Sequence, residues 1–388
     1  MKFANRMNLF GEGIFSTMAQ LRKKRQDAGL PVLDLSIGAP NIPPASHIIN
    51  AIAEGVTDRS NYVYAISDRT ELHEAVARWY KRRYGVTLDP AKQITSLLGS
   101  QDGLAHLALA IADPGDIVMV PDPCYPIFAD GPRIAGAEIY FMEQKADNHY
   151  LIDFSDIPDE VADKAKLMVV SYPNNPTTVM APESWYHELI AFAKKHDIIV
   201  LHDNAYSELV FDGKTTGSFL QYDGAFDVGI EFNSLSKTYG MAGARIGFCV
   251  GNTEVVQKLA LLKSNIDYGM FLPLQKGAIA ALDGDQSCVA ETRDAYERRR
   301  NCLCDGLTEI GWNVPRCEST MFVWAKIPAP YTSSVDFTMD LLNKAGFVVT
   351  PGSAFGPHGE GYVRMALVQD EEAMKEGIKR VKESGILG

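Results

Sequence analysis

The sequence predicts an α/β protein with a mainly parallel sheet and helices on both faces. Strand-like and helix-like patterns alternate from about residue 45 to residue 285, as is typical of such sheets. A chain of 388 residues with 46% hydrophobic content can bury a large core, and its length suggests two domains, or one large and one small. We find no internal repeat or low-complexity linker within the alternating region.

Short apolar runs indicate the strands, and longer amphipathic stretches indicate the helices. We expect strands at residues 94–98, 116–120, 166–171, 197–201, 228–233 and 246–250. We expect helices at residues 102–112, 127–135 and 182–196, and another that begins near residue 14. Towards the C-terminus, a long charged helix is expected over residues 292–307, and residues 320–325 are expected to begin a second sheet.

Charge and composition exclude several classes of function. The net charge is -12, the sequence pI is about 5.2, and there is no dense basic stripe, so neither nucleic acid nor a membrane is expected as a partner. The sequence shows no signal peptide and no 18-residue apolar run, which favours a cytoplasmic protein. Six scattered cysteines and eight unclustered histidines predict free thiols and no metal site.

Polar residues interrupt the apolar pattern where the expected strands end. These residues lie at 99–101, 122–125, 172–177, 202–206 and 234–237. Ligands of open α/β sheets bind beyond the carboxyl ends of the strands. Five loops are therefore expected to share one crevice.

The segment Ser234-Leu-Ser-Lys237-Thr-Tyr-Gly-Met-Ala-Gly-Ala-Arg245-Ile-Gly247 combines a strand-end lysine, expected on a turn, with an arginine eight residues later. This spacing suits a cofactor that carries both an aldehyde and a phosphate. A lysine that is desolvated or close to positive charge can form a Schiff base. Arg245 and the hydroxyls of Ser234 and Ser236 can hold a phosphate. Taken alone, the segment is equally compatible with a surface turn and a solvated arginine.

The other loops supply the remaining groups that a pyridoxal phosphate ring needs. Ser100 and the N–H groups around it can bind phosphate at the start of a helix. Asp203, if buried beside the pyridine nitrogen, keeps that nitrogen protonated, so that the ring can accept electrons. Tyr125 can stack on the ring, and Asn175 and Tyr206 can bond its phenolic oxygen. Each residue alone has an ordinary explanation as core aromatic, helix cap or turn, but their joint order at the strand ends favours a pyridoxal phosphate site.

Across nearly its whole length, the chain resembles the fold-type I, pyridoxal-phosphate-dependent aminotransferases of class I and II. The motif around Lys237 is highly specific for that family. The resemblance implies that Lys237 carries the cofactor as an internal aldimine and moves the proton. It also implies cofactor contacts at Ser100, Gln101, Tyr125, Asn175, Asp203, Tyr206, Ser234 and Arg245.

The resemblance also implies substrate-binding residues and a dimer. Gly361-Tyr-Val-Arg364-Met-Ala-Leu resembles the strand whose arginine binds the substrate α-carboxylate, and Leu35-Ser-Ile-Gly38-Ala-Pro resembles the loop whose glycine closes over the substrate. Members of the family form homodimers in which a tyrosine reaches the phosphate of the neighbouring subunit. We expect Tyr64, in preference to Tyr62, to take that role.

Two residues depart from the family pattern. Thr178 follows Asn-Pro-Thr where glycine is usual, and Gln101 stands where the LL-diaminopimelate and alanine aminotransferase subgroup commonly has lysine. The chain otherwise matches that subgroup closely around Gly-Ser-Gln-Asp-Gly-Leu-Ala-His and Asp-Pro-Cys-Tyr-Pro. The candidate amino donors are therefore LL-diaminopimelate, alanine, glutamate and aspartate, and the contact made by Gln101 stays open.

We thus expect a large domain over residues 45–285 with a seven-stranded sheet, and a small domain built from residues 1–44 and 286–388. The expected activity moves an amino group from an α-amino acid to a 2-oxo acid, with selectivity influenced by residues 10–18. A C–S or other β-lyase on the same scaffold would keep every cofactor residue, so the sequence leaves it open. A non-catalytic pyridoxal phosphate regulator is the third possibility, although such proteins usually carry a DNA-binding domain.

Overall fold

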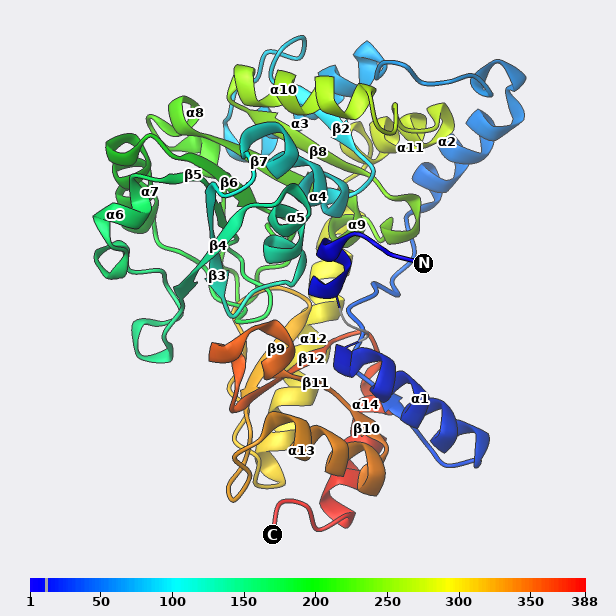
Figure 1. Cartoon of the computed structure of the whole chain (residues 1–388). Coiled ribbons are helices and arrows are strands. Elements are labelled where there is room, and N and C mark those ends of the chain that lie inside the picture. The colour runs from blue at the N-terminus through cyan, green and yellow to red at the C-terminus, as the bar shows by residue number, and fades with distance from the viewer. Residues whose placement is uncertain (11–12) are drawn as a thin grey trace.

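The computed structural model describes residues 1–10 and 13–388, without the side chains of residues 13–16. Its centre is a seven-stranded sheet with the order β2-β8-β7-β6-β5-β3-β4 (Figure 1). The strands are β2 (Ile94–Leu97), β3 (Ile117–Asp122), β4 (Glu138–Glu143), β5 (Ala165–Val170), β6 (Ile199–Asp203), β7 (Gly229–Ser234) and β8 (Gly247–Gly251). Only β8 runs antiparallel to its neighbours, which confirms the mainly parallel sheet.

Helices cover both faces of this sheet, so the central strands are apolar on both sides. In β5, Leu167 and Val169 pack against one helical layer, while Met168 and Val170 pack against the other. One layer contains α4 (Ser100–Ile111), α5 (Ile127–Ala135) and α10 (Thr253–Ser264). The other contains α2 (Ser46–Thr57), α3 (Thr70–Tyr84), α7 (Glu183–His196) and α11 (Leu272–Asp283), and the short helices α6 (Asp159–Ala162) and α8 (Ala225–Val228) lie near it.

Three differences from the expected elements have local causes. The strand β4 is not among the six expected strands; it lies at the sheet edge, and although residues 139–142 are an apolar run, only Met142 is buried. Helix α4 begins at Ser100 instead of residue 102, since the Asp102 carboxylate accepts a hydrogen bond from the Leu98 N–H. Lys237 lies in the one-turn helix α9 (Leu235–Thr238) and not in an irregular turn.

A second unit contains a three-stranded antiparallel sheet with the order β11-β12-β9. Its elements are α1 (Gly13–Asp27), β1 (Leu33–Asp34), α12 (Ser287–Glu309), β9 (Phe322–Lys326), α13 (Ser334–Asp340), β10 (Phe347–Val348), β11 (Thr350–Pro351), β12 (Tyr362–Ala366) and α14 (Glu371–Glu383). The long helix α12 leads from the first unit into the second (Figure 1). Strand β9 begins two residues later than expected, because Thr320 has a left-handed φ of 71°. Among the described residues, no helix is both long and apolar enough to cross a membrane.

Candidate active site

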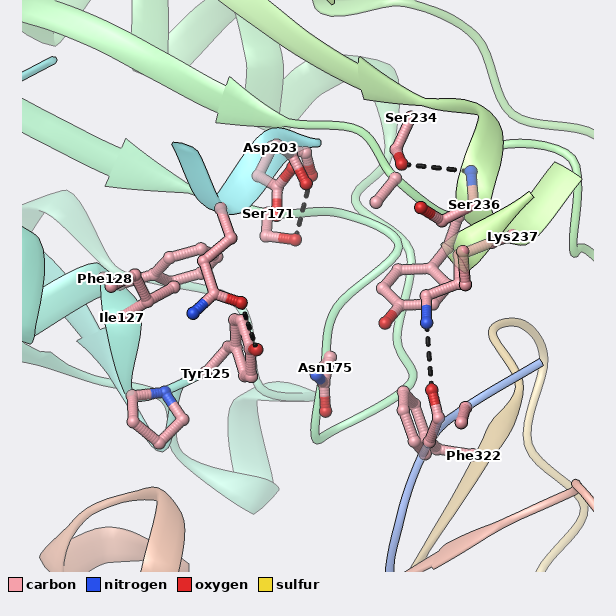
Figure 2. A pocket seen from close by; sticks show the side chains of 18 of the residues that line it. Tyr125, Ile127, Phe128, Ser171, Asn175, Asp203, Ser234, Ser236, Lys237 and Phe322 are labelled. Carbon is pink, nitrogen blue, oxygen red and sulfur yellow. Dashed lines mark hydrogen bonds between the residues drawn. The ribbon is translucent and has the colours of Figure 1, made fainter. Parts of the chain in front are cut away.

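A cavity of about 520 Å³ lies at the carboxyl ends of the central strands, where the two units meet. Figure 2 shows Lys237, Asp203 and Tyr125 arranged around it. Most of the sequence-predicted site residues line this cavity, namely Gly38, Ser100, Gln101, Tyr125, Asn175, Asp203, Tyr206, Ser234, Lys237, Arg245 and Arg364. Tyr64 is not among the lining residues.

Lys237 presents a desolvated amine to the cavity. The Ser234 hydroxyl at the end of β7 accepts a hydrogen bond from the Ser236 N–H at 3.1 Å, which caps α9 and fixes the turn that carries the lysine. Lys237 Nζ donates to the Gly38 carbonyl at 3.0 Å. Burial, together with the positive charges of Arg364 and Arg245, lowers the pKa of Lys237 to about 8. More of this amine is therefore neutral and nucleophilic near neutral pH than of an ordinary lysine.

Asp203 is a buried carboxylate at the end of β6. Burial raises the pKa of Asp203 to about 7, and the negative charge of Glu231 also raises it, while His202 and Lys237 oppose the shift. Its Oδ1 atom is buried and has no hydrogen-bond partner among the described residues. A carboxylate left unpaired in this way is costly unless a cationic or N–H donor occupies the cavity.

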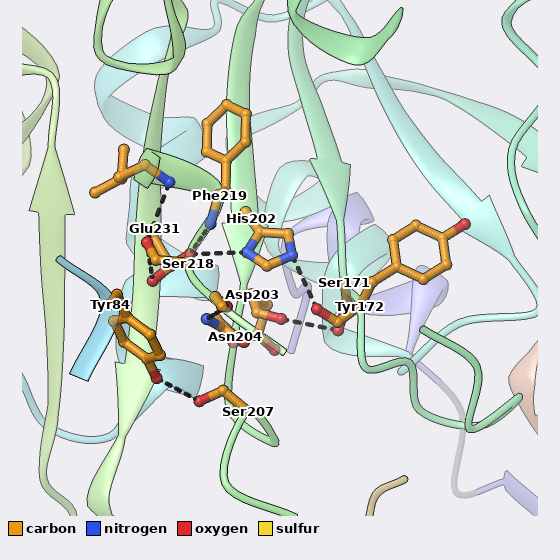
Figure 3. Close-up of polar contacts among 12 residues, drawn as sticks. Tyr84, Ser171, Tyr172, His202, Asp203, Asn204, Ser207, Ser218, Phe219 and Glu231 are labelled. Atoms are coloured by element: carbon orange, nitrogen blue, oxygen red, sulfur yellow. Dashed lines mark hydrogen bonds and ion pairs between the residues drawn. The ribbon is translucent and has the colours of Figure 1, made fainter. Parts of the chain in front are cut away.

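A buried hydrogen-bonded cluster lies behind Asp203 (Figure 3). His202 Nδ1 is 3.1 Å from Glu231 Oε2, and His202 Nε2 is 3.1 Å from the Tyr172 carbonyl oxygen. Glu231 also accepts hydrogen bonds from Tyr80 and Ser218, each at 2.9 Å. Because a carboxylate can only accept, His202 Nδ1 donates to Glu231, while Nε2 lies within hydrogen-bond distance of both the Tyr172 carbonyl and the Tyr186 hydroxyl, the latter at 3.3 Å.

Arg364 is a buried guanidinium held by both units. Its Nη1 donates to Asn175 Oδ1 and its Nη2 donates to the Ser36 carbonyl, both at 3.0 Å. The guanidinium carbon lies 4.2 Å from the ring centroid of Phe322 and 4.6 Å from that of Phe355. Burial lowers the pKa of Arg364 to about 10, so the group stays positive at neutral pH. Sequence reasoning missed Ser36, Phe322 and Phe355, because only the fold brings them to the arginine.

Arg245 lines the cavity and lies against Gly99. Gly99 has a φ of 79°, and a Cβ at this position would overlap the Arg245 guanidinium. Glycine therefore permits the arginine to lie against the N-terminus of α4, beside Ser100. The Tyr125 hydroxyl donates to Gln101 Oε1 at 3.2 Å, which gives a contact for the residue that departs from the family pattern. Tyr206 is buried, and burial raises its pKa well above the usual range.

Tyr64 and Tyr62 lie on an exposed surface away from the cavity. Tyr64 is 80% exposed, and its ring centroid is 5.5 Å from that of Tyr268. Tyr62 is 60% exposed and packs edge-on against Phe271 at 5.4 Å. The segment 10–18, which we expected to influence selectivity, includes residues 11 and 12, which lie outside the described residues.

Cysteines and acidic clusters do not contribute to the cavity. All six cysteines are free, as expected. Asp102, His106 and Asp267 form a cluster with ligand-like spacing. However, the Lys263 ammonium lies within it and bonds both carboxylates. The lysine neutralises the charge that would otherwise attract a cation.

The chain is similar to a known protein family and to individual proteins over nearly its whole length. The family model for aminotransferase class I and II matches residues 31–381. A Moorella thermoacetica protein named LL-diaminopimelate aminotransferase is 42% identical over 383 residues, covering 98% of both chains. A protein of the same name from Syntrophobacter fumaroxidans is 43% identical over 380 residues, again covering 98% of each.

Solved structures agree with these matches. The substrate-bound structure of BacF from Bacillus subtilis has a TM-score of 0.94 and 35% sequence identity, covering 99% of this chain and 98% of that one. A probable N-succinyldiaminopimelate aminotransferase from Thermus thermophilus has a TM-score of 0.90 and 33% identity, covering 96% of this chain and 100% of that one. The chain therefore belongs to the class I and II aminotransferases, which have fold type I and depend on pyridoxal 5'-phosphate.

Proposed function

We propose that this aminotransferase takes the amino group from LL-diaminopimelate and passes it to a 2-oxo acid. The main support for this reaction type is that Lys237, Asp203 and Arg364 line one cavity, and that Asp203 Oδ1 has no hydrogen-bond partner among the described residues. The donor follows from the full-length similarity to proteins named LL-diaminopimelate aminotransferase. Alanine, glutamate and aspartate are the alternative donors.

The residues that line the cavity fit pyridoxal phosphate. Asp203 would pair with a protonated ring nitrogen, which supplies the hydrogen bond that its buried Oδ1 lacks. Arg245 and the N-terminus of α4 would hold the phosphate, together with the hydroxyls of Ser100 and Ser234. When bound, the cofactor supplies an electron sink for negative charge that develops at the substrate α-carbon.

The other polar residues would orient the ring. The Asn175 amide nitrogen makes no hydrogen bond among the described residues, so it can donate to the phenolic oxygen while Oδ1 binds Arg364. Tyr206 would contact the same oxygen, because its high pKa keeps it a donor. Tyr125 would stack on the ring, and its bond to Gln101 would fix its position.

The chain's own residues then account for substrate alignment and proton movement. Arg364 would bind the α-carboxylate through its planar fork, with Phe322 and Phe355 on its two faces. Lys237 would hold the cofactor covalently, and after displacement its Nζ would take the proton from the α-carbon and later return it. The Gly38 carbonyl lies 3.0 Å from Nζ and would keep the free amine directed into the cavity.

We propose two domains, residues 45–285 and residues 1–44 with 286–388, that close around the substrate. Ser36 and Arg364 come from the smaller domain and Asn175 from the larger, so the Arg364–Asn175 hydrogen bond joins the two domains. Such a link would couple carboxylate binding to closure.

We further propose a cytoplasmic homodimer in which Tyr64 reaches the phosphate of the neighbouring subunit. The support is a group of exposed apolar side chains that a second copy would cover. They are Tyr62, Val63, Tyr64, Ile66, Ile266, Tyr268 and Phe271.

Borohydride trapping tests the site, and a substrate panel tests the reaction. The purified holoenzyme, reduced with borohydride, should hold the cofactor on the peptide that contains Lys237. With LL-diaminopimelate as donor and a set of 2-oxo acids as acceptors, an amino-acid product should form without ammonia. Label on another lysine would overturn the site, and ammonia release with every donor would favour a lyase. Faster turnover of alanine, glutamate or aspartate would change only the donor.

A further inference from the structure

A short loop between β11 and β12 carries one wall of the proposed carboxylate site. It consists of two single-turn helices, η8 (Gly352–Phe355) and η9 (Pro357–Gly359). Phe355, at the end of η8, packs its ring 4.6 Å from the guanidinium carbon of Arg364. The position of this loop therefore decides whether Arg364 is covered on that face.

Two hydrogen bonds and one close approach fasten this loop to the end of β3 and the segment that follows it in the other unit. The Cys124 N–H donates to the Phe355 carbonyl at 2.8 Å. His358 Nδ1 is 2.7 Å from Asp122 Oδ2. Between these contacts, Gly356 has a φ of 128°, and a Cβ there would overlap Asp122 Oδ1. The loop backbone thus lies directly on the Asp122 carboxylate.

The charges at this junction favour a strong contact. Asp122 is only 1% exposed, and burial raises its pKa, while the hydrogen bond and charge of His358 oppose that shift. A second carboxylate, Glu143 at the end of β4, has its Oε1 3.5 Å from His358 Nε2. The half-exposed imidazole therefore lies between two carboxylates, one of them buried, and a charge-assisted bond of this kind is stronger than a neutral one.

We propose that His358 is a positioning residue for the substrate α-carboxylate. By holding the loop on Asp122, it keeps Phe355 against Arg364, so that the guanidinium stays desolvated and aimed before substrate arrives. The inference rests on the proposed role of Arg364. His358 itself does not line the cavity, so its loss should weaken carboxylate binding and leave the cofactor and the proton transfer unchanged.

His358→Ala in the holoenzyme tests this assignment. We expect KM for amino acids to rise about tenfold, because the loop then keeps only the Cys124 N–H bond to the Phe355 carbonyl, with kcat within about twofold of wild type. His358→Gln can still donate to Asp122 and should recover most of the loss. The matched control is His187→Ala, which removes a half-exposed histidine that pairs with the exposed Glu183 and contacts the Tyr222 ring, away from the cavity. Cofactor absorbance should be the same in all variants.

Gly356→Ala disturbs the same contact between the loop and Asp122. It provides a second test if the His358→Ala variant does not fold. It should raise KM in the same way, because the added methyl pushes the loop off Asp122. Unchanged KM in both variants would overturn the inference, as would an equal loss with primary amines that lack a carboxylate. Arg364→Lys distinguishes a failure of the proposed function from a failure of this inference. If the Arg364→Lys variant turns over amino acids normally, the proposed role of Arg364 is wrong. If that variant is impaired while His358→Ala is not, only the role of His358 is wrong.

Discussion

Replacing Asp203 by Asn should stabilise the cofactor-free protein at pH 8 and impair the holoenzyme. Burial raises the pKa of Asp203 from 3.8 to about 7, and Oδ1 has no partner. Each pKa unit corresponds to about 1.4 kcal/mol, so the buried charge costs the folded apoprotein up to about 4 kcal/mol above pH 7. The Asn amide is also buried and poorly paired, which offsets about 1–3 kcal/mol of that gain. A net stabilisation of about 1–3 kcal/mol remains.

The sign of the pH dependence is fixed by this raised pKa. The folded protein binds the Asp203 proton more tightly than the unfolded chain does, so the free energy of unfolding falls as the pH rises from about 4 to about 7. The advantage of the Asp203→Asn variant is therefore complete above pH 7 and is lost below pH 4. In the holoenzyme the Asp203→Asn variant should be the weaker protein. The amide carries no negative charge to stabilise a protonated ring nitrogen, so turnover should fall about a hundredfold or more.

Urea unfolding of the cofactor-free proteins at pH 8 and pH 5 measures the stability difference. Asp223→Asn is the matched control, because Asp223 is exposed on the surface. The pH 5 difference should be the smaller of the two. If Asp203→Asn is less stable than wild type at pH 8, or equally stabilised at both pH values, then burial of an unpaired charge is the wrong description of Asp203. Normal turnover by the Asp203→Asn holoenzyme would refute the role of this carboxylate beside the ring.

Arg364→Lys replaces the planar guanidinium by a point charge, so kcat/KM for amino acids should fall about 10²–10³-fold, while kcat/KM for amines that lack a carboxylate should not change. Steady-state kinetics with both substrate classes measures this difference. Glu231→Gln weakens the carboxylate that accepts buried hydrogen bonds from His202, Tyr80 and Ser218, and it should lower the free energy of unfolding by about 1–3 kcal/mol; an unchanged free energy of unfolding in urea titrations would argue against this cluster. The rate at which the apoenzyme binds pyridoxal phosphate should rise with pH with a midpoint near 8, because the pKa of Lys237 is lowered to about 8. Stopped-flow absorbance measures this rate, and a midpoint at the ordinary lysine pKa would contradict the prediction. If the proposed homodimer forms, Tyr64→Phe should weaken cofactor binding several-fold without changing the oligomeric state, whereas Tyr62→Phe should not weaken it; equal effects in a cofactor titration would refute the role proposed for Tyr64.

The sequence predicts that Asn175, Asp203 and Lys237 share one cavity, and the structure brings them together there. The prediction depends on parallel strands. β5, β6 and β7 are buried strands followed by polar residues, and parallel strands bring such ends together. The edge strand β4 has an apolar run of which only Met142 is buried, and it is not among the expected strands.

The walls of the carboxylate site could not be predicted, because they come from segments far apart in the chain. Phe322 and Phe355 belong to different parts of the second unit, and neither lies in a motif that signals contact with Arg364.

The backbone conformation of Thr178 could not be predicted either. It has a φ of 66°, which a β-branched residue rarely adopts, and it is held there by its N–H bond to the Asn174 carbonyl and by the Ser319 hydroxyl at its own carbonyl.

The dipeptide His202-Asp203 shows how a strand can serve the core and the site together. Adjacent residues of a strand point to opposite faces of the sheet, so Asp203 faces the cavity while His202 faces Glu231 (Figure 3). Burial raises the pKa of Asp203, and the electrostatic effect of His202 acts in the opposite direction. Glu231 orients the His202 ring through its hydrogen bond with Nδ1, although its own charge raises the pKa of Asp203. The pKa of Asp203 therefore depends on groups on both faces of β6. A substitution of Glu231 should affect the cofactor although Glu231 does not contact the cofactor.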